Sequence, residues 1–111
     1  MTDLEIRDEI KKIVNEECGT LGFSVLRFIL FGSRARKDNK KDSDWDLIVV
    51  LNKAISWKEK MKLWLLINRR IAKIKTDVDI LFKSEQEYEN DKKDIGKTTY
   101  YANKEGVLIW S

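Results

Sequence analysis

The segment FGSRARKDNKKDSDWD, residues 31–46, contains a Gly-Ser turn, a run of basic residues and two acids. Asp44 and Asp46 lie two residues apart, so on a β-strand both carboxylates point to the same face. Two ionised carboxylates held this close repel each other, and a divalent cation removes that cost. The pair therefore has two interpretations: a metal site, or a solvated strand end on which the acids keep the edge soluble.

The Gly32-Ser33 pair lies where a strand would give way to a short helix. Glycine lets the backbone approach a ligand closely, and the free N–H groups at a helix start attract an anion. Arg34 and Arg36 follow directly, and their forked donors suit phosphate. The turn and its arginines therefore predict a phosphate site, with an ordinary turn and a solvated basic loop as the alternative.

A third acid, Asp79, interrupts the apolar run VDILF. An acid inside such a strand is costly unless it has a partner. Asp79 is therefore the candidate that completes a three-carboxylate site with Asp44 and Asp46. Asp77 would share its face and competes with it, but Asp79 lies deeper in the strand. The alternative is an acid on the solvent face of an edge strand.

Composition excludes several kinds of chemistry. The sequence has no histidine and only one cysteine, Cys18, so catalysis by histidine, structural zinc and disulfides within the chain are all excluded. A metal site in this chain must be built from carboxylates, which favours Mg²⁺ or Mn²⁺. The net charge of +3 is too mild to indicate a nucleic-acid binder by itself.

The length of 111 residues predicts a single domain over residues 1–111. No apolar run is long enough to span a membrane, and acids stand where a signal peptide would carry basic residues. We therefore expect a cytoplasmic protein. Capping-box patterns and apolar periodicity predict a small mixed β-sheet flanked by helices, an α/β (α+β) fold. We expect strands at 25–31, 44–51 and 77–82, helices at 2–18, 33–37 and 57–75, and a polar helical stretch from 84 that weakens at Gly96.

The helix expected at 57–75 carries an apolar stripe of residues at helical spacing. Two of its members, Trp57 and Trp64, are expected to pack in the core, as is Trp45. An exposed cluster of tryptophans would instead indicate a surface for a partner. The stripe consists of Trp57, Met61, Trp64, Leu65, Ile71 and Ile74.

Taken together, Gly32-Ser33, ten intervening residues and Asp44-Trp45-Asp46 resemble the signature of the minimal nucleotidyltransferases, which belong to the DNA polymerase beta superfamily. The segments LFGSRAR, SDWDLIVV, VDILF and EGVLIW are similar to their family counterparts in order and spacing, so the resemblance covers nearly the whole chain. Lys37 departs from the pattern, because many relatives carry glycine there. The resemblance therefore gives no conformation for the loop at 37–43.

The resemblance implies a polymerase beta-like catalytic domain with two Mg²⁺ ions, or Mn²⁺, at the three aspartates. Asp44 and Asp46 would bind the metals that carry the nucleoside triphosphate, and Asp79 would hold the catalytic metal and help to activate the acceptor hydroxyl. The phosphate-binding residues would be Gly32 and Ser33 for the β and γ phosphates of ATP, with Arg34 and Arg36 either balancing charge on the pyrophosphate or forming structural salt bridges.

The function implied is the transfer of AMP from ATP to a hydroxyl acceptor. Many minimal nucleotidyltransferases of this size are antitoxins that modify a tyrosine of a HEPN toxin, and we expect the same here. Two alternatives stay open: an antitoxin that neutralises its partner by contact alone, and an RNA-binding domain. RNA binding is not favoured, because acids dilute the basic loop and no aromatic residues are interleaved with it. Homo-oligomerisation is left open.

Overall fold

Three capping boxes start the long helices and α4. The computed structural model describes residues 1–37, 39–40 and 44–110. In each box a Ser or Thr hydroxyl accepts the backbone N–H of a glutamate three residues later, and that glutamate accepts the N–H of the Ser or Thr. The pairs are Thr2 with Glu5, Ser56 with Glu59 and Ser84 with Glu87, and they open α1 (Asp3–Thr20), α3 (Trp57–Ile71) and α4 (Glu85–Asp91).

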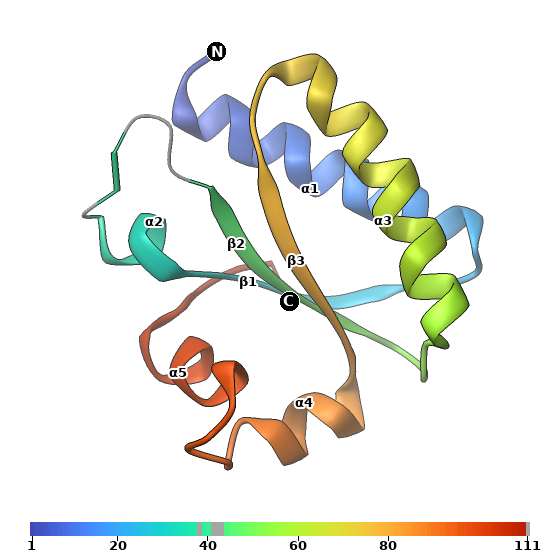
Figure 1. Cartoon of the computed structure of the whole chain (residues 1–111), viewed down its shortest axis with the longest axis vertical. Helices are drawn as coiled ribbons and strands as arrows, with labels where there is room; N and C mark the ends of the chain where they lie inside the picture. Colours follow the sequence, from blue (N-terminus) through green and yellow to red (C-terminus); the bar gives the residue numbers. More distant parts are fainter. Residues whose placement is uncertain (38, 41–43, 111) are drawn as a thin grey trace.

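The strands form one four-stranded mixed sheet in the order β3-β2-β1-β4 (Figure 1). β1 pairs antiparallel with β2 and with β4, whereas β2 and β3 are parallel and are connected through α3. The central position of β2 confirms the burial on both faces that its apolar run predicts. The strands are β1 (Val25–Phe31), β2 (Trp45–Leu51), β3 (Val78–Ser84) and β4 (Val107–Trp110).

Three short helical elements complete the chain. α2 (Gly32–Arg36) is a single turn directly after β1, and a 3-10 turn (Ala72–Ile74) extends α3. The polar stretch after β3 is divided into α4 and α5 (Thr98–Glu105) by the segment that contains Gly96. Within the described ranges, no helix is both long enough and apolar enough to cross a membrane.

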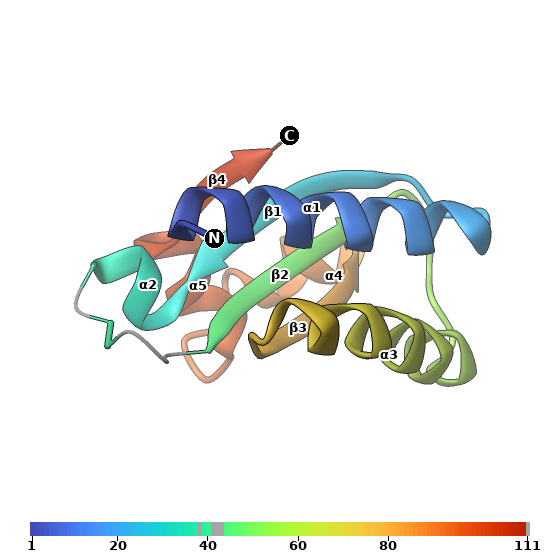
Figure 2. The same ribbon diagram turned by 90° about the horizontal axis from the view of Figure 1, so that it is seen from above.

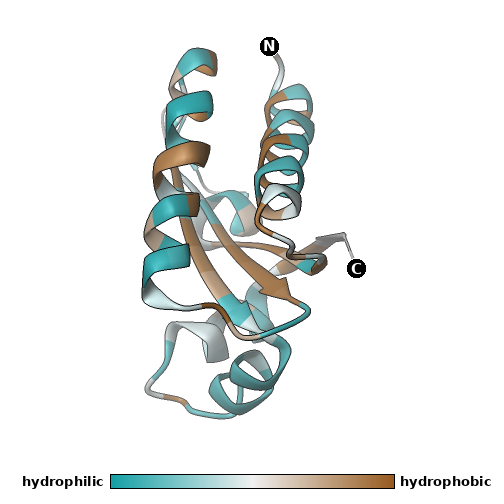
Figure 3. Ribbon diagram, turned by 90° about the vertical axis from the view of Figure 1, so that its right-hand side faces the viewer, coloured by the Kyte–Doolittle hydropathy of each residue, from teal (hydrophilic) through white to brown (hydrophobic). Residues whose placement is uncertain are grey.

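Helices cover both faces of the sheet. α1 and α3 run side by side over one face, and α4 and α5 lie against the other (Figures 1 and 2). Alternate residues of β2 serve the two layers: Leu47 and Val49 pack under α1 and α3, whereas Ile48 and Val50 pack against the α4 and α5 side. The strands between the helices are the most continuously hydrophobic part of Figure 3. Burial in the first layer raises the pKa of the Cys18 thiol to about 12.

The apolar stripe of α3 packs differently from its prediction. The side chains that α3 buries are Leu63, Ile67 and Ile71. Trp57 is 73% exposed and Trp64 is 52% exposed, so the expectation that both pack in the core is wrong. The helix is rotated so that its aliphatic residues face the sheet, and the two indoles lie outside the core. Trp45, in contrast, is buried as expected.

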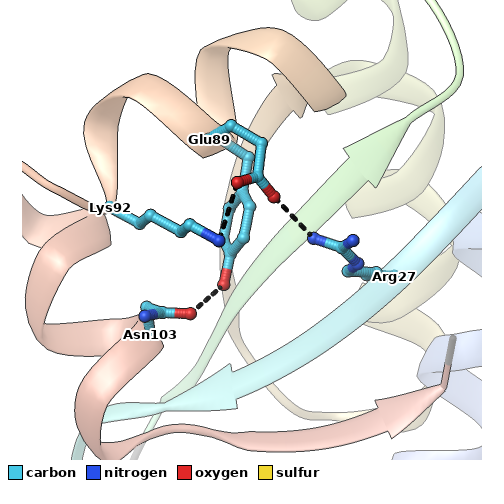
Figure 4. Close-up of polar contacts among 5 residues, drawn as sticks. Arg27, Glu89, Lys92 and Asn103 are labelled. Atoms are coloured by element: carbon cyan, nitrogen blue, oxygen red, sulfur yellow. Dashed lines mark hydrogen bonds and ion pairs between the residues drawn. The ribbon is translucent and has the colours of Figure 1, made fainter.

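A polar cluster ties α4 and α5 to β1 (Figure 4). Tyr88, on α4, is buried and donates its hydroxyl hydrogen to Oδ1 of Asn103 on α5 at 2.7 Å. Glu89 bridges Arg27 of β1 at 3.3 Å and Lys92 at 2.7 Å. The Arg27 guanidinium lies 5.6 Å from the centre of the Tyr88 ring. The cluster therefore joins α4 to both α5 and β1.

Tyr88→Phe is expected to lower the free energy of unfolding by about 1 kcal/mol, because it removes the hydrogen bond from Tyr88 on α4 to Asn103 on α5. Urea unfolding followed by circular dichroism measures this change. Tyr101→Phe is the matched control, since Tyr101 is 50% exposed and its loss of a hydroxyl should cost less than about 0.5 kcal/mol. Equal losses for the two variants would contradict the structural role of the Tyr88 hydroxyl.

Candidate active site

Two of the predicted acids meet at one end of the sheet. Asp46 on β2 and Asp79 on β3 are direct partners in the parallel register, so their side chains leave the same face. Asp77 precedes β3, and its backbone carbonyl accepts the N–H of Trp45 at 3.0 Å. The register therefore places Asp79, and not Asp77, beside Asp46.

Asp79 is exposed, as in the alternative that places it on the solvent face of an edge strand. The reason is that β3 is an edge strand of the sheet. Asp44 is also exposed and lies just before β2, which begins at Trp45. Asp44 and Asp79 therefore lie at an edge that is accessible from solvent.

The electrostatic environment of Asp46 reports the proximity of the other groups. Burial raises the pKa of Asp46, and the carboxylates of Asp79 and Asp44 raise it further. The Arg36 guanidinium acts in the opposite direction and lowers the same pKa. The charges of Asp79, Asp44 and Arg36 thus all act on Asp46 at this end of the sheet.

The Gly32 turn lies directly against Asp46. Gly32 has φ +72°, a left-handed conformation that favours glycine. A Cβ at this position would collide with Oδ2 of Asp46 and would approach its Cγ to 3.2 Å. The neighbouring residue Phe31 is the register partner of Asp46 across β1 and β2. The predicted phosphate turn and the predicted metal ligand are therefore in contact, and a side chain at position 32 would displace the Asp46 carboxylate.

The two arginines after the turn have different surroundings. The Arg34 side chain is only 6% exposed, and its guanidinium lies 4.2 Å from the centre of the Trp45 ring and 3.5 Å from Oδ2 of Asp3. Trp45 points to the α1 and α3 face, away from Asp46. Arg36 is exposed and acts on Asp46. These contacts favour a structural salt bridge as the role of Arg34. Arg36, in contrast, lies near enough to Asp46 to lower its pKa.

The contact between Arg34 and Trp45 was missed from the sequence. The available signal was the alternation along β2, which turns Trp45 to the face opposite the acids. The predicted basic loop cannot be placed as a whole, because Asp38 and residues 41–43 lie outside the described residues. Lys37, at the C-terminal end of α2, has φ 62°, a left-handed conformation that favours glycine.

The residues fit a divalent cation by their chemistry. All three donors are carboxylates, the type that Mg²⁺ and Mn²⁺ prefer, and Asp46 is flanked by the other two in sequence and in register. Across residues 1–37, 39–40 and 44–110, however, no three Asp, Glu or Cys side chains converge closely enough to enclose a cation. The site is thus an edge that carries the right donors without a closed coordination sphere.

Comparison with known proteins agrees with this fold. The family model described as "Polymerase beta, Nucleotidyltransferase" matches residues 5–109. The chain therefore belongs to the polymerase beta nucleotidyltransferase family. Its mixed sheet with flanking helices is the nucleotidyltransferase fold that the sequence predicts.

Two solved structures are similar to this chain. A structure described as a minimal nucleotidyltransferase superposes with a TM-score of 0.58 at 23% identity, covering 96% of this chain and 95% of that one. A crystal structure of a toxin-antitoxin with AMP-PNP superposes with a TM-score of 0.59 at 17% identity, covering 92% and 73%. At these identities the likeness shows the fold. No curated protein matches the sequence.

Proposed function

We propose that this protein transfers a nucleoside monophosphate, AMP from ATP, to a hydroxyl group of a protein partner. The observation that carries the proposal is the contact between the Gly32 turn and Asp46, which is itself the register partner of Asp79. A phosphate-binding turn placed directly against a carboxylate pair suits a nucleoside triphosphate together with a divalent cation.

Asp44, Asp46 and Asp79 would hold the metal ions. When bound, divalent cations supply charge stabilisation for the attacking and leaving oxygens of an in-line displacement at phosphorus. Asp46 is central to the set, because the carboxylates of Asp79 and Asp44 both raise its pKa and its own carboxylate lies against the Gly32 turn. Without a cation these three carboxylates repel each other, so the chain's own charges favour cation binding.

The turn would position the triphosphate. Gly32 and Ser33 offer backbone N–H groups and a hydroxyl to the β and γ phosphates, and the absence of a Cβ at Gly32 lets this backbone lie against Asp46. Arg36, which is exposed beside the acids, would balance negative charge on the departing pyrophosphate. Arg34 would act indirectly by holding Trp45 and with it the start of β2.

Asp79 would orient the acceptor. Its carboxylate is exposed on an edge strand, so a hydroxyl can donate a hydrogen bond to it. In the reaction, the acceptor oxygen bonds to the α phosphorus, the bond from that phosphorus to the oxygen bridging to the β phosphate breaks, and pyrophosphate leaves. The acceptor proton passes to the Asp79 carboxylate and then to solvent.

An open edge suits a macromolecular acceptor. We assign the acceptor as a tyrosine of a HEPN-type toxin, which makes this protein an antitoxin. Support comes from the fold it shares with one component of a toxin-antitoxin complex that contains AMP-PNP. The likeness to that complex, which contains AMP-PNP, also favours adenine as the base.

The test is a transfer assay with the partner protein encoded by a neighbouring gene. The two proteins are co-purified, incubated with ATP and Mg²⁺, and the partner is weighed by intact mass spectrometry. The expected result is a gain of one AMP or more on a tyrosine, and no gain when EDTA is present. An unmodified partner that is nevertheless neutralised would contradict transfer and favour an antitoxin that acts by contact.

A further inference from the structure

An apolar groove lies between α3 and the sheet edge, away from the Gly32 turn. Its volume is about 340 Å³. α3 supplies one wall, with Trp57, Met61 and Trp64 at successive helical turns, and β3 supplies the other. The residues that line the groove are Trp57, Lys60, Met61, Trp64, Ile80, Leu81, Phe82 and Lys83.

The exposure of these side chains is not required by the fold. α3 is anchored by Leu63, Ile67 and Ile71, which are almost fully buried. The side chains of Trp57, Met61 and Trp64, on the neighbouring part of the helix surface, are exposed to solvent. Two tryptophans and a methionine at one groove form a contiguous apolar patch, whereas the apolar residues of an ordinary surface are scattered singly. Tryptophan is also among the residues that carry most binding energy in protein interfaces. The stripe therefore has the composition of an interface core.

The second wall is a strand edge. β3 has a neighbour on one side only, β2, so its other side is a sheet edge (Figure 1). Four consecutive residues, 80–83, line the groove, so both faces of the strand contribute to it. An extended segment added beside β3 could bond to the strand backbone while its alternate side chains enter the groove.

The charges around the groove indicate which kind of partner it can bind. The two charged residues that line the groove, Lys60 and Lys83, are basic, and no described lining residue is acidic. Lys83 contacts Asp91 at 2.8 Å, so Lys60 is the stronger contributor. A second basic row, Lys58, Lys62 and Arg69, lies along the outer side of the stripe by helical spacing. The apolar stripe is thus bordered by positive charge on both sides.

We propose that this groove binds an extended, acidic segment of a partner protein, whose apolar side chains pack on Trp57, Met61 and Trp64. Acidic residues of the segment pair with Lys60 and with the outer basic row. A second copy of this chain is a poorer occupant, because a symmetric contact would bring the same basic residues of both copies together. The inference does not depend on nucleotidyl transfer, although β3 also carries Asp79.

The test uses two synthetic peptides with the same alternating valine and isoleucine residues, one with glutamate and one with lysine at the other positions. Binding is measured by fluorescence anisotropy of the labelled peptides at low salt, together with amide exchange of residues 79–83. We expect the glutamate peptide to bind at least about tenfold more tightly and to protect these amides. Equal binding of the two peptides would overturn the proposal.

Variants locate the contact. Trp64→Ala should weaken the glutamate peptide about tenfold or more, and Lys60→Glu should reverse the preference between the peptides. Ile95→Ala is the matched control, because Ile95 is 64% exposed and does not line the groove. Unchanged binding by Trp64→Ala would refute the site. A dimer in sedimentation equilibrium that Trp64→Ala abolishes would make a second copy the occupant and equally refute it.

Discussion

The double substitution Asp44→Asn with Asp46→Asn is expected to reduce nucleotidyl transfer on the order of 10³-fold or more, since it removes the charges that hold the metal ions. The asparagine side chains keep the size of the originals, so the fold should persist. In metal-free buffer the double variant should melt no lower than the wild type, because the repulsion around Asp46 is relieved. Transfer rates come from the time course of AMP incorporation into the partner.

A matched pair of single variants tests the third carboxylate. Asp79→Asn should abolish transfer to a similar extent, whereas Asp77→Asn should leave it within about twofold of wild type. Both residues are exposed and lie two positions apart, but only Asp79 is the register partner of Asp46. Activity that survives Asp79→Asn and is lost in Asp77→Asn would reverse the assignment.

Gly32→Ala is expected to destabilise the fold by about 2 kcal/mol and to abolish transfer, since it combines two costs. The left-handed φ of +72° strains any residue with a Cβ, and that Cβ would displace the Asp46 carboxylate. The first cost affects stability, and the second affects the geometry of the site. Chemical denaturation and the transfer assay measure them separately.

Two other glycines separate these costs. Gly22 has φ +81°, but a Cβ there would meet only the Lys53 ammonium nitrogen at 3.7 Å, so Gly22→Ala tests strain alone. Gly19 lies in α1 with nothing within 4 Å of the added atom, so Gly19→Ala should be neutral or stabilising by up to about 1 kcal/mol. Both variants should retain transfer. If Gly32→Ala lost stability but kept full activity, the turn would have no role at the site.

The local structure follows closely from the sequence where short-range chemistry determines it. All three capping boxes start helices at the predicted residues, and the strand predicted at 25–31 has these bounds in the structure. β2 begins at Trp45, one residue later than predicted, and ends at Leu51, as predicted. These features depend on neighbours in the chain, and a single sequence contains that information.

Features that depend on the packing of distant elements were less predictable. Periodicity alone does not say which stripe of α3 faces the sheet, and the two tryptophans were placed wrongly for that reason. Similarly, the sequence left open whether Asp79 lies on an edge strand, because the position of β3 at the sheet edge is a property of topology. The contact of Arg34 with Trp45 and Asp3 joins three segments, which no local pattern reveals.

We predict that nucleotide and metal bind together at the Gly32 turn and the aspartate edge. Paramagnetic broadening tests it most directly: Mn²⁺ is added with a non-hydrolysable ATP analogue to ¹⁵N-labelled protein, and amide signals are followed by NMR. The predicted result is broadening centred on residues 32–33, 44–46 and 79, with residues 57–64 of α3 unaffected, and its loss in the Asp44→Asn, Asp46→Asn variant. Broadening centred elsewhere, or equal broadening in that variant, would contradict the assignment.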